Sequence, residues 1–155
     1  MELDNFSVIE QEFHDRVSRI VWCTFTTIDR QDRPRSRILH PIWEGHHGWI
    51  ATGRHSHKSK HIERNPFVSL TYWDAAQEQV YADCKATWAD DKETKDRVWA
   101  LYESTPPPLG YDLTAFWPNG SGDPEFGVIS LEPWRIELSS LADLANPRIW
   151  RQSVE

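Results

Sequence analysis

The segment WIATGRHSHKSKHIERNP, residues 49–66, decides the fold of this chain. Its first residues, Trp49 to Thr52, are aromatic, β-branched or small and begin a strand. Gly53 permits a bend, and Ser56 is a suitable N-cap for a helix that starts near His57. The helix must stop before Asn65-Pro66, because the residue before a proline avoids the α region. The segment therefore predicts a strand, a tight turn and a short helix.

The same segment is basic although the chain carries a formal net charge of −7. It holds Arg54, Lys58, Lys60 and Arg64 against a single acid, Glu63. A helix N-terminus adds free backbone N–H groups and the positive end of the helix dipole. Together these features are adequate for a phosphate site, although the glycine pattern of a P-loop is absent. A solvated basic helix is the alternative interpretation.

Outside this segment, short β-branched and aromatic runs alternate with turns. The predicted strands are Ile20–Ile28, Pro34–Glu44, Trp49–Thr52, Phe67–Trp73, Gln77–Trp88, and Phe126–Leu138 with an interruption at Pro133. The predicted helices are Phe6–Arg19 and a second helix that runs from Asp90 or Asp91 to Glu103. The tail through Arg151 is predicted to be irregular. About six antiparallel strands with a few short helices indicate a mainly β chain that forms a small barrel.

Length and composition limit the possible functions. The 155 residues suit one domain, residues 1–155. The acidic balance argues against a nucleic-acid partner, whose binding surface would be basic. No stretch is long and apolar enough for a membrane span or a signal peptide. Cys23 and Cys84 are far apart in sequence and suit buried, reduced thiols. We therefore expect a soluble, cytoplasmic protein.

Four motifs in register resemble the pyridoxamine 5'-phosphate oxidase-like split β-barrels. They are PRSRILH (34–40), WIATGRHSHK (49–58), NPFVSL (65–70) and QEQV (77–80), with a weaker echo at PRIWR (147–151). The resemblance covers roughly residues 20–90. It implies a split β-barrel that holds FMN, or in one branch a deazaflavin coenzyme, between the two subunits of a homodimer.

The resemblance also assigns cofactor-binding positions. It places Arg35, Arg37 and His40 on the strand that runs along the flavin ring and reaches the phosphate, and Ala51 and Thr52 on a strand that contacts the ring. The positions that it implies for the phosphate are Ser56, His57, Lys58 and Lys60. It places Gln79 at the pyrimidine end of the ring, contributed by the partner subunit.

Two departures from the family pattern modify this prediction. His57 stands where the family usually has arginine, so a mostly neutral imidazole replaces a permanent charge. The segment KSKHI, residues 58–62, also resembles the deazaflavin-using branch, which keeps that cofactor as an alternative. The resemblance implies an FMN-dependent oxidoreductase. Because residues 148–151 read RIWR and lack the substrate histidine of true pyridoxamine phosphate oxidases, we expect a different substrate.

The sequence also permits other functional interpretations. The same barrel could be a non-catalytic module that stores or senses flavin or haem. His57 and His61 lie one helical turn apart and could bind a metal with His55, but Lys58 repels a cation, and we expect no metal site. The segment TPPPLGY, residues 105–111, is either a rigid connection or a substrate lid. No catalytic residue is nominated, because hydride chemistry belongs to the cofactor.

Overall fold

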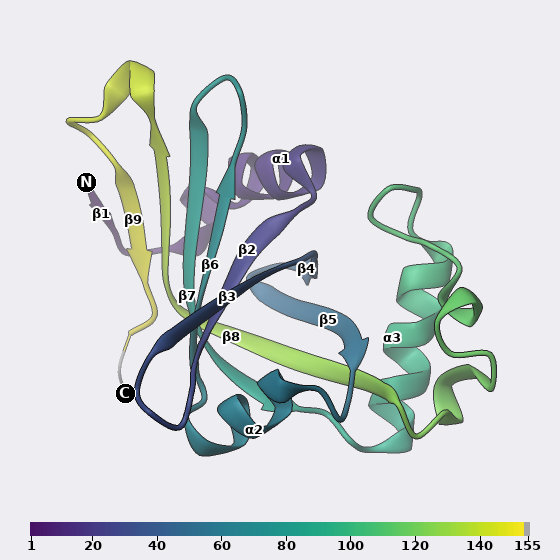
Figure 1. Cartoon of the computed structure of the whole chain (residues 1–155). Helices are drawn as coiled ribbons and strands as arrows, with labels where there is room; N and C mark the ends of the chain where they lie inside the picture. The colour runs from purple at the N-terminus through teal and green to yellow at the C-terminus, as the bar shows by residue number, and fades with distance from the viewer. Residues whose placement is uncertain (154–155) are drawn as a thin grey trace.

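The computed structural model describes residues 1–153, and its core is one curved sheet of nine strands (Figure 1). The strands are β1 (Glu2–Leu3), β2 (Cys23–Ile28), β3 (Pro34–Leu39), β4 (Ile42–Glu44), β5 (His47–Gly53), β6 (Phe67–Trp73), β7 (Glu78–Trp88), β8 (Phe126–Ser140) and β9 (Arg148–Arg151). The helices are α1 (Glu10–Ile20), α2 (His57–Arg64) and α3 (Lys92–Ser104). Short 3-10 turns occur at Phe6–Val8, Leu113–Ala115, Gly120–Gly122 and Leu141–Asp143. The mainly β prediction is confirmed.

The long strand β8 joins two parts of the sheet. The main order is β1-β9-β8-β7-β6-β2-β3, and β5 pairs with the first half of β8 while β4 pairs with β5. All pairings are antiparallel except that of β1 with β9. β8 pairs with β7 along most of its length and with β5 at its start. The sheet therefore curls into a barrel that is open between β3 and β5.

The alternation predicted for the fifth strand is observed in β7. Val80, Ala82, Cys84 and Ala86 are at most 1% exposed, and they pack with Phe13 and Val17 of α1 in the main core. The side chains between them point to the opposite face, as the two-residue period of a strand requires. Both cysteines are free and buried, as predicted. Burial raises the pKa of the Cys23 thiol to about 12, which keeps it protonated.

The expected strand Pro34–Glu44 and the C-terminal tail differ from the prediction. The expected strand Pro34–Glu44 is two strands, because the chain leaves β2 after Leu39 and β4 pairs with β5 instead. The intervening Pro41 has no backbone N–H to continue a ladder. The tail is not irregular: β9 pairs with β8, and its Trp150 is buried against Phe6.

Pro133 does not end its strand. β8 runs through it, and the register with β7 shifts between Asp83 and Cys84, so that Trp134 is the extra residue of a bulge. A bulge accommodates a proline because the local ladder is already interrupted.

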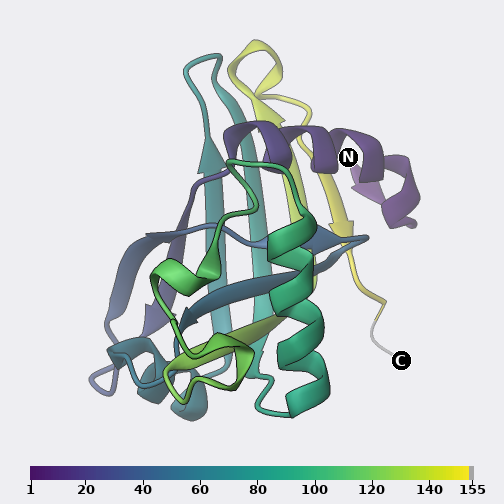
Figure 2. The same cartoon turned by 90° about the vertical axis from the view of Figure 1, so that its right-hand side faces the viewer.

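The helices cover three different sides of the sheet (Figures 1 and 2). α1 crosses one end, α2 lies at the opposite end below β2, and α3 with the segment after it covers the β4–β5 side. A second apolar cluster, which includes Val98, Tyr102 and Phe126, lies under α3. No helix within residues 1–153 has the length and apolar character needed to cross a membrane.

Candidate functional site: a cation-lined cleft beside α2

Helix α2 is held against the sheet by Ile62, which is 3% exposed and belongs to the main core. Its end is as predicted, with Asn65 in an extended conformation before Pro66. Ser56 is the N-cap residue of α2, as predicted, but its side chain makes no capping hydrogen bond. Its hydroxyl donates to the Gly53 carbonyl at 3.0 Å instead of accepting from an amide of the first turn. The hydroxyl oxygen is therefore free to accept from Lys58.

A cleft of 420 Å³ opens between α2 and the turn that joins β2 to β3. Its lining side chains are mostly cationic or titratable, and we call it the α2 cleft: Asp29, Arg30, Gln31, Arg33, Arg35, His57, Lys60 and His61. Three of the predicted phosphate residues, Arg35, His57 and Lys60, are thus brought together. The i, i+4 spacing of His57 and His61 places both rings on the side of α2 that faces the cleft.

Asp29 is the one carboxylate in the lining, and its negative charge is already engaged. It accepts from the backbone N–H groups of Gln31 and Arg33 at 2.9 and 3.0 Å, and from Arg33 Nε at 3.0 Å. Burial opposes its ionisation, but the hydrogen bonds from Arg33 and Gln31 prevail and lower the pKa of Asp29 to about 2. A carboxylate satisfied in this way fixes the turn, and its Oδ2 also forms an ion pair with Arg35 Nη1 at 3.7 Å.

Lys58, Ser56 and Arg37, which were also predicted to bind the cofactor, are not in the lining of the α2 cleft. The Lys58 side chain is buried, and its Nζ donates to Ser56 Oγ at 2.8 Å. Burial, and secondly the charge of Arg37, lower the pKa of Lys58 to about 8. An ammonium group with few anionic neighbours in a partly dry position is prepared to pair with an incoming anion.

The sequence did not indicate Thr27 and His61, the two residues that connect Arg37 with the α2 cleft. Arg37 donates to Thr27 Oγ1 at 2.9 Å, and Thr27 Oγ1 is also 2.9 Å from His61 Nδ1. Neither Thr27 nor His61 was predicted to bind the cofactor. Thr27 is an ordinary strand residue in the sequence, and 34 positions separate it from His61. The one available signal was the i, i+4 pair His57 and His61, which pointed to a metal instead.

The other basic residues of the segment have structural partners. Arg54 pairs with Asp90 at 2.7 Å and lies over the Trp88 ring, 4.6 Å from its centroid. Arg64 pairs with Asp32 at 2.9 Å. These two guanidinium groups tie the ends of α2 to neighbouring segments, so only part of the predicted basic cluster faces the cleft.

The predicted ring-contact residues lie elsewhere on the sheet. Ala51 and Thr52 are both buried in β5, and the Ala51 N–H donates to the Tyr102 hydroxyl at 3.3 Å. His40 Nε2 donates to the Leu109 carbonyl at 3.0 Å, which ties the proline-rich segment to the end of β3. Burial lowers the pKa of His40. In the free chain His40 therefore contacts the 105–111 segment and not the α2 cleft.

Gln79 lies in a separate cleft of 370 Å³ on the outer face of β7 and β8. We call it the β7–β8 cleft, lined by Ser69, Gln79, Tyr81, Asp83, Arg135, Glu137, Ser139, Leu144 and Pro147. The Tyr81 hydroxyl donates to Gln79 Oε1 at 3.1 Å. Within one chain the structure does not bring Gln79 together with the α2 cleft.

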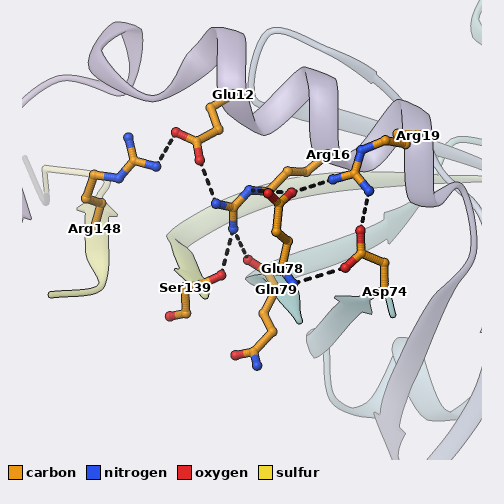
Figure 3. A network of polar contacts seen from close by, with 8 residues as sticks. All are labelled: Glu12, Arg16, Arg19, Asp74, Glu78, Gln79, Ser139 and Arg148. Carbon is orange, nitrogen blue, oxygen red and sulfur yellow. Dashed lines mark hydrogen bonds and ion pairs between the residues drawn. The ribbon is translucent and has the colours of Figure 1, made fainter. Parts of the chain in front are cut away.

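A buried arginine fixes the strand ends that carry this second cleft (Figure 3). Arg16 of α1 donates to the carbonyl oxygens of Gln79 and Ser139 at 2.9 and 2.7 Å, and to Glu12 at 2.6 Å. Arg19, one helical turn later, pairs with Asp74 and Glu78 of the β6–β7 hairpin. Arg148 of the predicted substrate segment is engaged with Glu12.

Among residues 1–153, no group of three or more His, Cys, Asp or Glu side chains is arranged to hold a metal ion. The α2 cleft instead offers guanidinium, ammonium and imidazole groups, a donor set that matches a phosphate ester. The residues present thus fit the anionic end of a phosphorylated cofactor.

This architecture, with a barrel open between β3 and β5 and a cationic cleft beside α2, is a split β-barrel. A protein-family model described as pyridoxamine 5'-phosphate oxidase matches residues 9–140, and the chain therefore belongs to that family. The resemblance found in the sequence motifs is confirmed. A search against proteins of curated function found no matching sequence.

Several solved structures share the fold. A Clostridium acetobutylicum protein related to general stress protein 26 of B. subtilis aligns with a TM-score of 0.75 and 12% identity, covering 95% of this chain and 96% of that one. A pyridoxamine 5'-phosphate oxidase-related, FMN-binding protein of Nostoc punctiforme gives 0.66 and 16%, with 98% of each chain covered. HutZ, a heme storage protein of Vibrio cholerae, gives 0.64 and 17%, covering 81% and 89%.

Proposed function

We propose that this protein is an FMN-dependent oxidoreductase whose α2 cleft binds the phosphate of the cofactor. The observation that carries the proposal is the convergence of Arg35, His57 and Lys60 on one cleft, with Lys58 and Ser56 hydrogen-bonded to each other at the start of the same helix. These residues come from the two motifs that resemble the family's phosphate-binding positions. Family membership and the FMN-binding relative of the same fold support the same cofactor.

The chain's own residues hold and orient the cofactor in this proposal. Lys58, Lys60 and Arg35 pair with the phosphate, and β3 and β5 border the space for the ring. A bound flavin supplies hydride transfer to or from a small-molecule substrate. The protein contributes a fixed geometry and the exclusion of water, which account for much of the rate in such reactions.

A homodimer completes the proposed site. Gln79 lies outside the α2 cleft of its own chain, so a contact between Gln79 and the cofactor requires a second copy. The outer face of the sheet that bears Gln79 also exposes Ile38, Phe67 and Trp73, which are 62%, 57% and 57% exposed. Large apolar side chains grouped on one sheet face are typical of a subunit contact.

The cofactor proposal is tested by titrating the purified, cofactor-free protein with FMN and following the quenching of flavin fluorescence. Lys58→Ala removes a buried charge that would contact the phosphate, a contact worth about 1.5–3 kcal/mol, so we expect roughly 10- to 100-fold weaker binding. Lys92→Ala, at an 87% exposed side chain on α3, is the matched control and should bind as the wild type does. Wild-type protein that takes up no FMN at micromolar concentration would overturn the proposal.

The same purified protein distinguishes the proposed function from two alternatives, a deazaflavin-dependent enzyme and a non-catalytic storage or sensing module. The KSKHI motif at residues 58–62 favours a deazaflavin, and the haem-storing relative of the same fold favours a non-catalytic module. The visible spectrum of the freshly purified protein distinguishes flavin, deazaflavin and haem. Turnover of the bound flavin with NAD(P)H and an acceptor supports an enzyme, whereas a chromophore that is never reduced supports a storage or sensing module.

A further inference from the structure

The Thr27 hydroxyl lies at the centre of a hydrogen-bonded chain that ends in the α2 cleft. Thr27 is fully buried in β2, and its Oγ1 contacts Arg37 Nη1 and His61 Nδ1, each at 2.9 Å. Arg37 comes from β3 and His61 from α2, so the hydroxyl joins β2, β3 and α2.

Hydrogen counting fixes the role of each atom in this chain. A guanidinium group can only donate, so Thr27 Oγ1 accepts from Arg37. The hydroxyl hydrogen then needs an acceptor, because a buried donor left without one is destabilising. His61 Nδ1 is the acceptor within reach, which requires that Nδ1 carry no hydrogen. The neutral imidazole therefore carries its hydrogen on Nε2.

The position of His61 directs this hydrogen to a ligand. The imidazole lines the α2 cleft, and Thr27 occupies Nδ1, so Nε2 is the ring atom available to a molecule bound there. The charged and titratable groups that share the cleft with His61 or act on its charge are Asp29 after β2, Arg30 and Arg33 in the turn, Arg35 and Arg37 of β3, and His57 and Lys60 of α2. Six of these seven groups are cationic or can become so, and Asp29 is engaged with Arg33.

We propose that His61 binds the anionic group in the α2 cleft through its Nε2 hydrogen, and that Thr27 is the positioning residue that holds this tautomer. The proposal rests on the function proposed above, because it takes the anion to be the cofactor phosphate. It adds a binding residue that lies outside the predicted phosphate motif, and it gives Arg37 a defined indirect role.

The proposal has a consequence for pH dependence. Burial, and secondly the charge of Arg37, lower the pKa of His61, so the ring is neutral at pH 7 in the free protein. A bound phosphate raises that pKa, and a group whose pKa rises on binding strengthens binding as the pH falls. The added proton goes to Nδ1, which then donates to Thr27 Oγ1 while the hydroxyl hydrogen turns away from the ring. The complex therefore gains an ion pair with the phosphate on the acidic side of neutrality.

The experiment compares FMN with riboflavin, which lacks the phosphate, between pH 5.5 and 8. His61→Phe removes the donor, and we expect about tenfold weaker FMN binding with riboflavin binding unchanged. His61→Gln keeps a neutral donor, so at pH 8 it should bind FMN within about twofold of the wild type. At pH 5.5 the His61→Gln variant should bind FMN more weakly than the wild type, because only the imidazole of the wild type gains a positive charge. Using the ratio of the two proteins cancels the titration of the phosphate itself.

Thr27→Val is nearly isosteric and tests the positioning role separately. Its readout is the ¹⁵N chemical shifts of the His61 ring, which report which nitrogen carries the hydrogen. We expect a single Nε2–H tautomer in the wild type and a mixture in the variant, with FMN binding weakened and riboflavin binding retained. His55→Phe, at a 63% exposed side chain paired with Glu125, is the control for the loss of a nearby histidine.

The outcomes separate this proposal from the one on which it rests. If the wild type binds FMN but His61→Phe binds it equally well, the role of His61 is wrong and the cofactor assignment stands. A His61→Phe effect that is the same for riboflavin as for FMN would also overturn it, because the contact would not be to the phosphate. If the wild type binds no FMN at any pH, both proposals fail together.

Discussion

At the scale of single residues, the basic segment 54–64 separates into two groups with different tasks. Arg54 and Arg64 are engaged by carboxylates on other elements and serve the fold. Lys58 is buried beside a hydroxyl and another cation. A charge held near a like charge in a partly dry position is costly until an anion arrives, so Lys58 is the residue of the segment most sensitive to ligand binding.

The lowered pKa of Lys58 predicts a loss of FMN affinity in alkaline solution. Free Lys58 loses its proton near pH 8, whereas phosphate stabilises the protonated form, so affinity should fall as the pH rises from 7 to 9.5. We expect a decrease of about tenfold, the equivalent of one charged hydrogen bond of about 1.4 kcal/mol. Titrations at each pH measure it. Lys58→Arg keeps its charge throughout, and an equally steep decrease in that variant would contradict the assignment.

At the scale of elements, α1 fastens two strand ends that local sequence does not connect. Arg16 donates to the backbone of β7 at Gln79 and of β8 at Ser139 (Figure 3). Its side chain is 7% exposed, and Arg19 on the same helix is 50% exposed. The buried residue orders the strands that form the β7–β8 cleft, while the exposed one makes surface ion pairs with the hairpin.

This difference predicts unequal effects of the same substitution. Arg16→Met removes a buried charge, leaves the carbonyl groups of Gln79 and Ser139 without this donor and leaves Glu12 paired with Arg148 alone. It should lower the free energy of unfolding by about 3 kcal/mol. Arg19→Met removes solvent-exposed pairs and should cost at most about 1 kcal/mol. Urea denaturation monitored by tryptophan fluorescence measures both. Equal losses in the two variants would show that burial does not determine the contribution of Arg16.

At the scale of the whole molecule, the predicted ligand contacts are divided between two faces. The α2 cleft lies at one end of the barrel, and Gln79 lies on the outer sheet face in another cleft. In the proposed dimer each of these two faces meets its complement on the partner, as twofold symmetry requires.

The dimer proposal predicts that Ile38→Glu weakens both association and FMN binding. In a symmetric dimer a carboxylate at this exposed position of β3 would be buried in an apolar contact, which is strongly unfavourable. Analytical ultracentrifugation should show a dimer for the wild type and a monomer for the variant. Phe116→Glu, at a 68% exposed aromatic outside the sheet, is the control. A wild-type monomer that binds FMN fully would refute the proposal.

The sequence alone predicted the class of fold and the segment that carries the cleft. The alternation in residues 77–88 and the strand–turn–helix of residues 49–66 are local patterns, and both were correct. Local patterns did not indicate that His40-Pro41 divides a strand or that residues 148–151 form β9. The sequence motifs also predicted Arg35, His57 and Lys60, which share the cleft, and Gln79, which does not.

Only the tertiary structure decided which side chains meet. The contact of Thr27 with His61, the pairing of Arg54 with Asp90 and the hold of Arg16 on Ser139 each join residues more than 30 positions apart. Periodicity in a sequence records which face of an element is buried, because that depends on the element alone. The partner of a polar group depends on how several elements pack. It is therefore defined only by the curled sheet with α2 packed against β2.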